Sequence, residues 1–505
     1  MAKVRLIDGE VSTGVLVVGL AHGEGKNPTL HIESGDLVLD TKPLLAALAD
    51  LGATGRTDEI IRLPGSSIRL LVFTGLGKEA RKYPHELLRR AAGAATRALA
   101  GNAEVSFALP VADVHAVNAI AEGAAIAAYS FEEFRGSTKG DARTPVSSIT
   151  VHTTLANSTE SKNISKRATI TGQYNSLVRD LVNTPPSHLT PISFVEQIKK
   201  AVADAGGEKA GLKITVLNEK QLKSQGFGGI TGVGQGSSNP PRLLHIAYTP
   251  KKSKKRYAFV GKGITFDTGG LALKAGLGME AMKSDMAGAA AVCAATLAIA
   301  ALKLPIQIDA WAALAENMVS DTATRPGDIV TIYGGKTVEV LNPDAEGRLV
   351  LADALVKAVE VANTGGTKSR KLDGIIDVAT LTGAQLIALG TRTGAVMTND
   401  ETFSAQFLQA AGEAGDSLWP MPLPEELRAS LDSPVADMAN IGDKMGGMLV
   451  AGLFLREFVP TDLPWVHVDI AGPSYNIHEP HGYTPKGGTG MPMRSLIRFA
   501  ENNVE

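Results

Sequence analysis

Three charged side chains lie within five positions at the start of an apolar stretch. The segment NPDAEGRLVLADAL, residues 342–355, contains Asp344, Glu346 and Arg348, and the spacing of its apolar residues is that of a helix. Bringing such groups together away from water is costly unless they bind something. Acidic residues also occur at helix N-termini because they suit the helix dipole. Taken alone, the segment therefore allows either a binding site or an ordinary charged helix start.

A second charged stretch lies upstream, in FVGKGITFDTGGLALKAGLGMEAMKSDMAGAAAV at residues 259–292. It contains Lys262, then Asp267 at the expected end of a strand, and Asp285 at the expected start of an Ala-rich helix. Lys262 and Asp267, five residues apart, would face opposite sides of a straight strand. Four glycines between positions 261 and 270 permit the bends that would let both side chains reach one place.

Carboxylates from these two stretches could form a metal site. In open α/β sheets, ligands bind beyond the carboxyl ends of the strands, where loops meet helix N-termini. Asp267, Asp285, Asp344 and Glu346 carry four negative charges, which two divalent ions would balance. Oxygen ligands suit Mg²⁺ or Mn²⁺ and tolerate Zn²⁺, and a pair of such ions can activate a water for hydrolysis. Acids at loop–helix junctions are often only caps or surface pairs, so spacing alone leaves both interpretations open.

The composition is that of a globular α/β protein. The chain has 505 residues, of which 44% are hydrophobic and 20% charged, and 54 glycines favour many turns at strand ends. A net charge of −2 gives no general attraction to nucleic acid or to an anionic membrane. The single Cys293 lies in an apolar run, where we expect an inert core residue. A disulfide framework is excluded, and a reducing, intracellular setting is expected.

The elements divide the chain into two domains. Residues 1–165 alternate short apolar runs with Ala-rich helical stretches, which predicts an α/β domain with a mainly parallel sheet. Residues 166–184 form a connecting helix or linker, and the prolines of TPPSHLTP mark its end. Residues 185–505 form the second domain, with clearer strand–helix alternation. Its strand candidates are KITVL, LLHIAY, RYAFVG, IQIDAWAAL, VEVLN, GIIDVATL and WVHVDIAG.

Other suggestive segments have ordinary explanations. Residues 286–302 carry no charge, but most are alanine, which gains little in lipid, so a buried helix is expected. GLGK at 75–78 lacks the rest of a phosphate-loop pattern, and KKSKKR at 251–256 reads as a solvated loop before a strand. The histidines near the C-terminus lack a recognisable metal-ligand spacing and are expected to be structural: His467, His478 and His481.

Together, the motifs resemble the leucyl aminopeptidase (cytosol aminopeptidase) family over roughly residues 170–505. NPDAEGRL is similar to the family signature NTDAEGRL, and GKGITFDTGG, MKSDMAGAA, DVATLTGA and HVDIAGP follow the family order. The resemblance implies a smaller N-terminal α/β (macro-like) domain and a larger C-terminal α/β metallopeptidase domain with a mixed, largely parallel sheet. It further implies a cytoplasmic homohexamer that removes N-terminal residues, Leu-like ones preferred, from peptides with a free N-terminus.

The resemblance also implies roles for individual residues. The two divalent ions, manganese or zinc, would have as ligands Lys262, Asp267, Asp285, Asp344 and Glu346. Asp267 and Glu346 would bridge the ions, and Asp344 would serve the more exchangeable one. Lys274 would stabilise the oxyanion, and Arg348 would anchor a bicarbonate acting as general base. The substrate pocket would be lined by Met282, Asn342, Thr380, Leu381 and Gly383.

One position departs from the family pattern. The family usually has Thr where this chain has Pro343, so a hydroxyl and a backbone N–H are absent, and Asn342 is restricted towards extended geometry. We expect changed local hydrogen bonding, with an effect on affinity for the exchangeable metal. Two alternatives to the peptidase are a different dinuclear metallohydrolase, such as a phosphatase, and a DNA-binding or architectural hexamer on the same fold. The net charge gives the second alternative no support.

Overall fold

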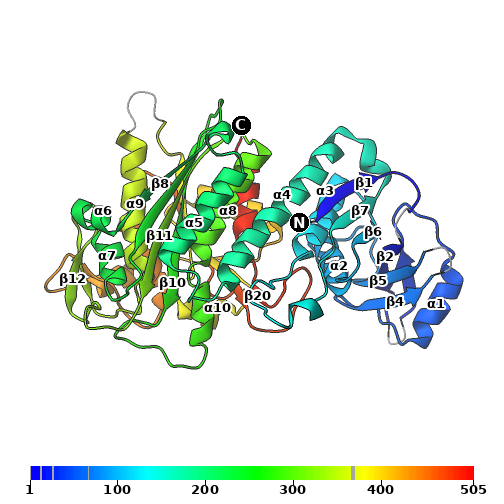
Figure 1. Cartoon of the computed structure of the whole chain (residues 1–505), viewed down its shortest axis with the longest axis horizontal. Helices are drawn as coiled ribbons and strands as arrows, with labels where there is room; N and C mark the ends of the chain where they lie inside the picture. The colour runs from blue at the N-terminus through cyan, green and yellow to red at the C-terminus, as the bar shows by residue number, and fades with distance from the viewer. Residues whose placement is uncertain (1, 12–13, 26–27, 66–67, 365–369, 505) are drawn as a thin grey trace. The chain divides into compact units, whose positions relative to one another are not determined.

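The structure, a computed structural model, describes residues 2–11, 14–25, 28–65, 68–364 and 370–504. Helices and strands alternate along most of this chain, as the ribbon shows (Figure 1). The predicted two-domain α/β class is confirmed, since both large sheets are mixed and mainly parallel, with helices packed on them.

The chain forms two compact units, each made of two pieces. Unit 1 consists of Met1–Ser176 and Ile477–Lys486, and unit 2 of Leu177–Asn476 and Gly487–Glu505. The long helix α4 (Thr159–Asn183) passes from the first unit into the second. It overlaps the predicted connector at 166–184, and the predicted domain limits stay predictions.

Unit 1 is built on a sheet of order β1-β7-β6-β2-β5-β4, with β3 paired to β2. The neighbours from β1 to β5 pair in parallel, whereas β3 and β4 are antiparallel. Its strands are β1 (Lys3–Ile7), β2 (Val15–His22), β3 (Leu30–Glu33), β4 (Ile60–Pro64), β5 (Leu70–Lys78), β6 (Glu104–Ala108) and β7 (Ser148–His152). The helices are α1 (Thr41–Asp50), α2 (His85–Ala98) and α3 (Val114–Ala127), joined by the first part of α4.

Side chains alternate across the central strand β2 and supply two cores. Val15 and Val17 pack with α2 and α3, whereas Leu16 and Val18 pack with Leu48 of α1 on the other face. The near-continuous apolar run of β2 follows from burial on both faces, as expected for a central parallel strand.

Unit 2 holds an eight-stranded sheet of order β16-β15-β18-β14-β10-β11-β9-β8. The four central strands, β18, β14, β10 and β11, are parallel to one another. The strands are β8 (Leu212–Leu217), β9 (Arg242–Tyr248), β10 (Arg256–Asp267), β11 (Gln307–Asn317), β14 (Gly374–Ala379), β15 (Gly394–Thr398), β16 (Leu418–Pro420) and β18 (Trp465–Asp469). The helices are α5 (Pro191–Asp204), α6 (Glu219–Gln225), α7 (Gly228–Gly234), α8 (Ala287–Leu302), α9 (Gly347–Thr364), α10 (Gly383–Leu389), α11 (Glu401–Ala414), α12 (Gly447–Arg456) and α13 (Met493–Asn502).

Helix α8 lies close to the centre of this sheet because its side chains are small. A Cβ on Gly288 of α8 would lie 2.1 Å from the carbonyl oxygen of Val378, and one on Gly261 of β10 would lie 2.5 Å from Cα of Ala289. Met279–Leu302 is, within the described chain, the one helical segment long and apolar enough to cross a membrane, but 89% of its most apolar window is buried. The predicted buried helix is confirmed, and it brings Asp285 to the sheet.

One predicted strand lies outside the main sheet of unit 2. VEVLN was predicted to be a strand of the second domain and directly precedes the turn with Asp344 and Glu346. The structure has β13 (Thr337–Val340) in a small separate sheet between β12 (Asp328–Thr331) and β17 (Met438–Ala439). Strand β13 is antiparallel to β12 and parallel to β17, and the turn after it carries Asp344 and Glu346 to α9, as predicted. The same turn reaches the main sheet, where Asn317 of β11 donates to the carbonyl oxygen of Pro343.

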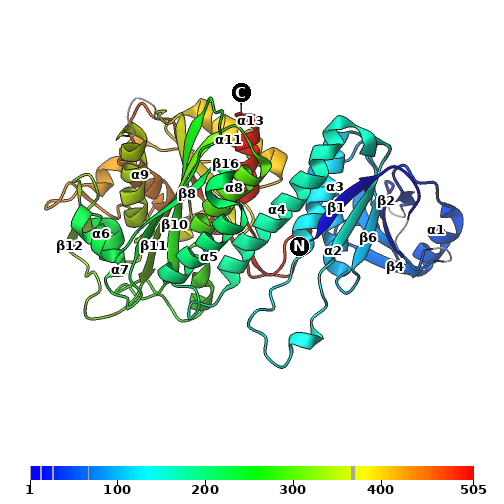
Figure 2. The ribbon, with the colours of Figure 1, turned by 45° about the horizontal axis from the view of Figure 1, so that its top comes forward.

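The segment Ile477–Lys486 leaves unit 2 after β19 (Tyr475–Asn476) and returns at β20 (Gly487–Gly488). It packs against α2, where the Tyr483 hydroxyl donates to Glu86 over 2.8 Å. A Cβ on Gly93 of α2 would lie 2.5 Å from Cβ of Tyr483, so a glycine is needed for this close approach. Figure 2 shows α2 and the neighbouring elements from a second angle.

Candidate metal centre

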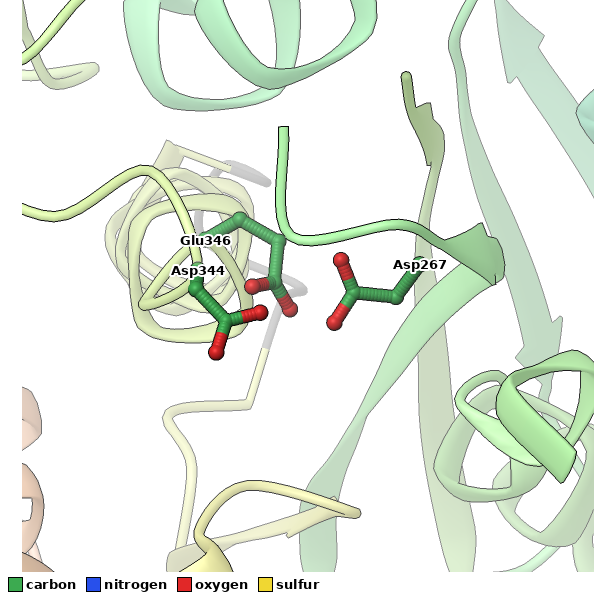
Figure 3. Close-up of side chains that lie close together, drawn as sticks. All are labelled: Asp267, Asp344 and Glu346. Carbon is green, nitrogen blue, oxygen red and sulfur yellow. The ribbon is translucent and has the colours of Figure 1, made fainter. Parts of the chain in front are cut away.

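Three carboxylates from two separate segments converge in unit 2. One oxygen each of Asp267, Asp344 and Glu346 lies within 4.8 Å of the other two (Figure 3). Asp267 ends the central strand β10, and the other two lie in the turn before α9. The sequence analysis predicted that these acids come together, and the structure brings these three together.

The geometry of β10 explains how Lys262 and Asp267 serve one site. The register with β11 shifts between Ile264 and Asp267, where β10 contains a bulge. One extra residue reverses the alternation of side chains, which removes the conflict expected for a straight strand. The bend expected from the glycines therefore lies between Ile264 and Asp267, after Gly263 and before Gly269, and not at a glycine.

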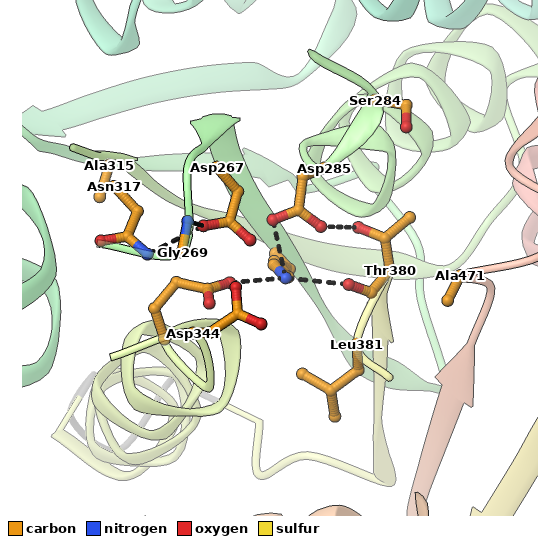
Figure 4. Close-up of polar contacts among 12 residues, drawn as sticks. Asp267, Gly269, Ser284, Asp285, Ala315, Asn317, Asp344, Thr380, Leu381 and Ala471 are labelled. Atoms are coloured by element: carbon orange, nitrogen blue, oxygen red, sulfur yellow. Dashed lines mark hydrogen bonds and ion pairs between the residues drawn. The ribbon is translucent and has the colours of Figure 1, made fainter. Parts of the chain in front are cut away.

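Lys262 is buried and contacts the fourth acid. Its Nζ lies 2.8 Å from Oδ2 of Asp285, 2.8 Å from Oε1 of Glu346, and 2.9 Å from the carbonyl oxygen of Thr380, to which it donates. The Thr380 hydroxyl donates to Oδ1 of Asp285 over 2.8 Å, and Figure 4 shows these two side chains facing each other. A Cβ on Gly347, the first residue of α9, would lie 2.6 Å from Cε of Lys262, so a larger residue there would have to displace the end of the lysine side chain.

Lys274 contacts two of the acids, Asp267 and Asp344. Its Nζ lies 2.9 Å from Oδ2 of Asp267 and also pairs with Oδ1 of Asp344. The loop that carries it turns at Gly269, whose N–H donates to Asp267 over 2.8 Å. Gly269 has a φ of +86°, and a Cβ there would lie 2.8 Å from Asp344, so only glycine suits this turn.

Burial shapes the ionisation of the cluster. Burial raises the pKa of Asp285 well above its ordinary value against the opposing effect of Lys262, and burial with Asp267 raises the pKa of Glu346. Burial alone would lower the pKa of Lys262, but Asp285, Glu346 and Asp267 outweigh it, so this pKa is raised. In the protein without cations, burial therefore favours protons on Asp285 and Glu346, and the acids favour the charged form of Lys262.

The donor set fits divalent cations. Four carboxylates face two lysines, and Oε2 of Glu346 is buried without a hydrogen-bond partner among the described residues. Such an oxygen is costly unless a cation or another donor reaches it. Four carboxylates with one lysine nitrogen form a mainly oxygen ligand set, which suits Mn²⁺, Mg²⁺ or Zn²⁺, and two such ions would balance the four carboxylate charges.

Arg348 is the second residue of α9 and is buried. Its Nη1 donates to the carbonyl oxygen of Asn440 over 2.7 Å, and its guanidinium lies over the ring of Phe454. Burial lowers the pKa of Arg348 to about 10, against the effects of Glu346 and Asp469. Its Nε has no hydrogen-bond partner within the described part of the chain, so one donor stays open to a bound anion.

A cavity of about 420 Å³ opens beside this group. Three of the five predicted substrate residues line it: Asn342, Leu381 and Gly383. Thr380 lies instead against Asp285, and Met282 belongs to the 3₁₀ turn Met279–Ser284 just before that acid. The sequence reasoning missed a further group of lining residues: Ile441, Asp443, Lys444 and Val450. The glycine-rich NIGDKMGG was the signal that could have marked them.

The remaining candidates are not ligands in this cluster of acids. His467 is buried on β18 and bonds to Asp377 of β14, as expected of a structural residue. His478 and His481 belong to unit 1. Cys293 is buried inside α8, and burial raises its pKa, which makes the thiol inert at neutral pH.

Comparison with known proteins agrees with this geometry. The family model described as "Cytosol aminopeptidase family, catalytic domain" matches residues 176–497, and that of the family's N-terminal domain matches 17–138. The chain is 48% identical to a probable cytosol aminopeptidase of Streptomyces coelicolor, covering 96% of this chain and 95% of that one. It is 45% identical to one of Micrococcus luteus, covering 98% and 97%.

A solved structure is similar along the whole chain. The bottromycin maturation enzyme BotP in complex with Mn is 34% identical, covers 98% of this chain and 100% of its own, and superposes with a TM-score of 0.84. These matches favour a peptidase over the DNA-binding alternative. The chain therefore belongs to the cytosol aminopeptidase family and is an enzyme, a peptidase of the hydrolase class.

Proposed function

We propose that the enzyme is a metal-dependent aminopeptidase that hydrolyses the N-terminal residue, preferably Leu-like, from peptides with a free N-terminus. It uses two divalent ions, manganese or zinc. The observation that carries the proposal is the approach of Asp267, Asp344 and Glu346 to within 4.8 Å, in a chain of this family and beside a substrate-sized cavity.

The acids and one lysine would hold the ions. Lys262, Asp267, Asp285 and Glu346 are assigned to the tighter ion, and Asp267, Asp344 and Glu346 to the more exchangeable one. Bound dications supply a Lewis acid for the scissile carbonyl and an acidified water. Lys262 can serve as a ligand only when it is neutral, so cation binding has to displace the proton that the acids otherwise hold on it.

Lys274 and Arg348 would act on the substrate side. Asp267 raises the pKa of Lys274 against the effect of burial, so this lysine stays charged and can stabilise negative charge on the carbonyl oxygen. Arg348 presents a rigid fork and an unpaired Nε, which suits a planar anion such as bicarbonate acting as general base.

Five residues would bind the substrate. Asn342, Leu381 and Gly383 line the cavity, and Thr380 and Met282 border Asp285. We also infer a cytoplasmic homohexamer, a state supported by the family resemblance and, for the compartment, by the names of the relatives. Mn²⁺ is the first ion to test, because BotP was solved with it.

The test measures release of p-nitroaniline from leucine p-nitroanilide. We expect activity with Mn²⁺, loss on chelation, recovery on adding the ion back, and no cleavage of the N-acetylated substrate. Asp285→Ala should retain less metal and show little turnover with its fold intact, whereas Asp321→Ala, a change at an exposed position, should resemble wild type. A folded, Mn²⁺-loaded protein inactive on every aminoacyl substrate would refute the proposal.

A further inference from the structure

Asn317 ends strand β11 directly beside the end of β10. The two strands are parallel, and the register pairs Asn317 with Asp267 immediately after the bulge. The main-chain oxygen of Asn317 accepts from both the N–H and the hydroxyl of Thr268, over 3.0 and 2.9 Å. These bonds fix the backbone of Asn317 to the loop that leaves the metal centre.

The side-chain amide of Asn317 joins the two segments that carry the acids. Its Nδ2 donates to Oδ1 of Asp267 over 2.8 Å and to the carbonyl oxygen of Pro343 over 3.1 Å. Figure 4 shows the amide beside Asp267 and Gly269. Both partners can only accept, so the amide nitrogen, not the oxygen, must face them.

The surroundings hold the amide in this orientation. Asn317 is 5% exposed, and a Cβ on Gly270 would lie 2.9 Å from its Oδ1 and 3.2 Å from Cβ of Pro343. Gly270, with a φ of +59°, therefore leaves the space that the amide occupies. Pro343 has no N–H, so its carbonyl oxygen is the one hydrogen-bonding group of its own backbone, and the Asn317 amide binds it.

The two hydrogen bonds of the Asn317 amide hold together two segments whose carboxylates repel each other. Asp267 belongs to β10, whereas Asp344 and Glu346 belong to the turn before α9, and like charges brought together favour separation of the two segments. A neutral group with two donors can hold both segments without adding charge. An aspartate of the same shape has no donor for either partner.

We propose that Asn317 is a positioning residue that holds Asp267 at a set distance from the 342–346 turn and so preorganises the metal centre. This inference rests on the proposed function, because it concerns the same ions. Neutral groups that orient metal ligands typically change metal affinity by about 10- to 100-fold when they are replaced.

The test compares Mn²⁺ binding by calorimetry in wild type, Asn317→Asp and Asn317→Ala. A matched control is Asn239→Asp, since Nδ2 of Asn239 likewise donates to a carboxylate over 2.9 Å, that of Glu316, the residue before Asn317 in β11. We expect at least about tenfold weaker Mn²⁺ binding in both Asn317 variants and unchanged binding in the control. Thermal unfolding in chelator shows whether each variant is folded.

A second readout separates positioning from general damage. High Mn²⁺ should restore much of the kcat of Asn317→Ala, with KM for leucine p-nitroanilide within about twofold of wild type, because the ligands themselves are present. Wild-type Mn²⁺ affinity in folded Asn317→Ala would overturn the inference, as would equal weakening in Asn239→Asp. Should wild type itself bind no Mn²⁺, the proposed function fails, and this inference fails with it.

Discussion

Nζ of Lys262 lies 2.8 Å from Oδ2 of Asp285, and both side chains are buried. The ammonium group also lies 2.8 Å from Glu346, so one positive charge serves two buried acids. A single lysine therefore supplies, in the protein alone, part of the positive charge that cations would supply in the loaded centre.

Replacing Lys262 with methionine should destabilise the metal-free protein. Asp285 and Glu346 would lose their shared cation, and an unpaired buried charge costs about 3–5 kcal/mol. We expect a loss of unfolding free energy near that size at pH 8 in chelator. The loss should shrink towards pH 5, because burial already raises the pKa of both acids and they become protonated. Denaturant unfolding measures the loss of unfolding free energy at each pH, and Lys254→Met, at an exposed position, is the control. Equal stability of variant and wild type at pH 8 would contradict the pairing.

Gly347→Ala should damage the centre without damaging the helix. The new Cβ would lie 2.6 Å from Cε of Lys262 and has to displace it. Alanine otherwise favours helix by about 0.5–1 kcal/mol, so thermal stability should change little. Mn²⁺ affinity and turnover should fall by about tenfold or more. Gly412→Ala in α11 is the matched control, since its Cβ would meet nothing within 4 Å. Full activity in Gly347→Ala would show that the Lys262 side chain can reach the acids without the space left by Gly347.

Asp353 should make stability depend on pH. It is fully buried in α9, where burial raises its pKa to about 7 against hydrogen bonds from the N–H groups of Tyr333, Ile230 and Gly229. The folded state then binds a proton between pH 4 and 7 that the unfolded state releases, so unfolding free energy falls as pH rises through this window. The fall from this group is at most about 4 kcal/mol.

Asp353→Asn removes that titration. Urea unfolding at pH 5 and pH 8 should show a smaller fall with pH in the variant than in wild type, and the difference reports Asp353 alone. A variant whose stability falls with pH as steeply as that of wild type would show that the carboxyl group is ionised throughout.

Much of the fold follows from local patterns. Long apolar runs such as RYAFVG identify β10, because a strand buried on both faces needs apolar side chains at every position. Shorter strands such as β7 and β15 escaped prediction, since their few residues carry little pattern of their own. The place of β13 depends on pairing with β12 and β17, which lie elsewhere in the sequence.

Some residues of the site could also be predicted from the sequence, and others could not. Asp267, Asp344 and Glu346 stand out because charged residues at strand ends and helix starts are visible in the sequence, and the structure brings them together. Asn317 and Asn440 do not stand out, because an amide gains its meaning only from the groups that folding places beside it. The extra residue in β10 is likewise visible only once β11 is alongside.

The return of Ile477–Lys486 to unit 1 means that the chain crosses between its two units three times. No single break in the polypeptide can release either unit intact, and a fragment beginning at Leu177 would carry ten residues whose packing partners, such as Gly93 and Glu86, are missing. Replacing residues 1–176 with those of a relative would therefore require replacing the segment Ile477–Lys486 as well.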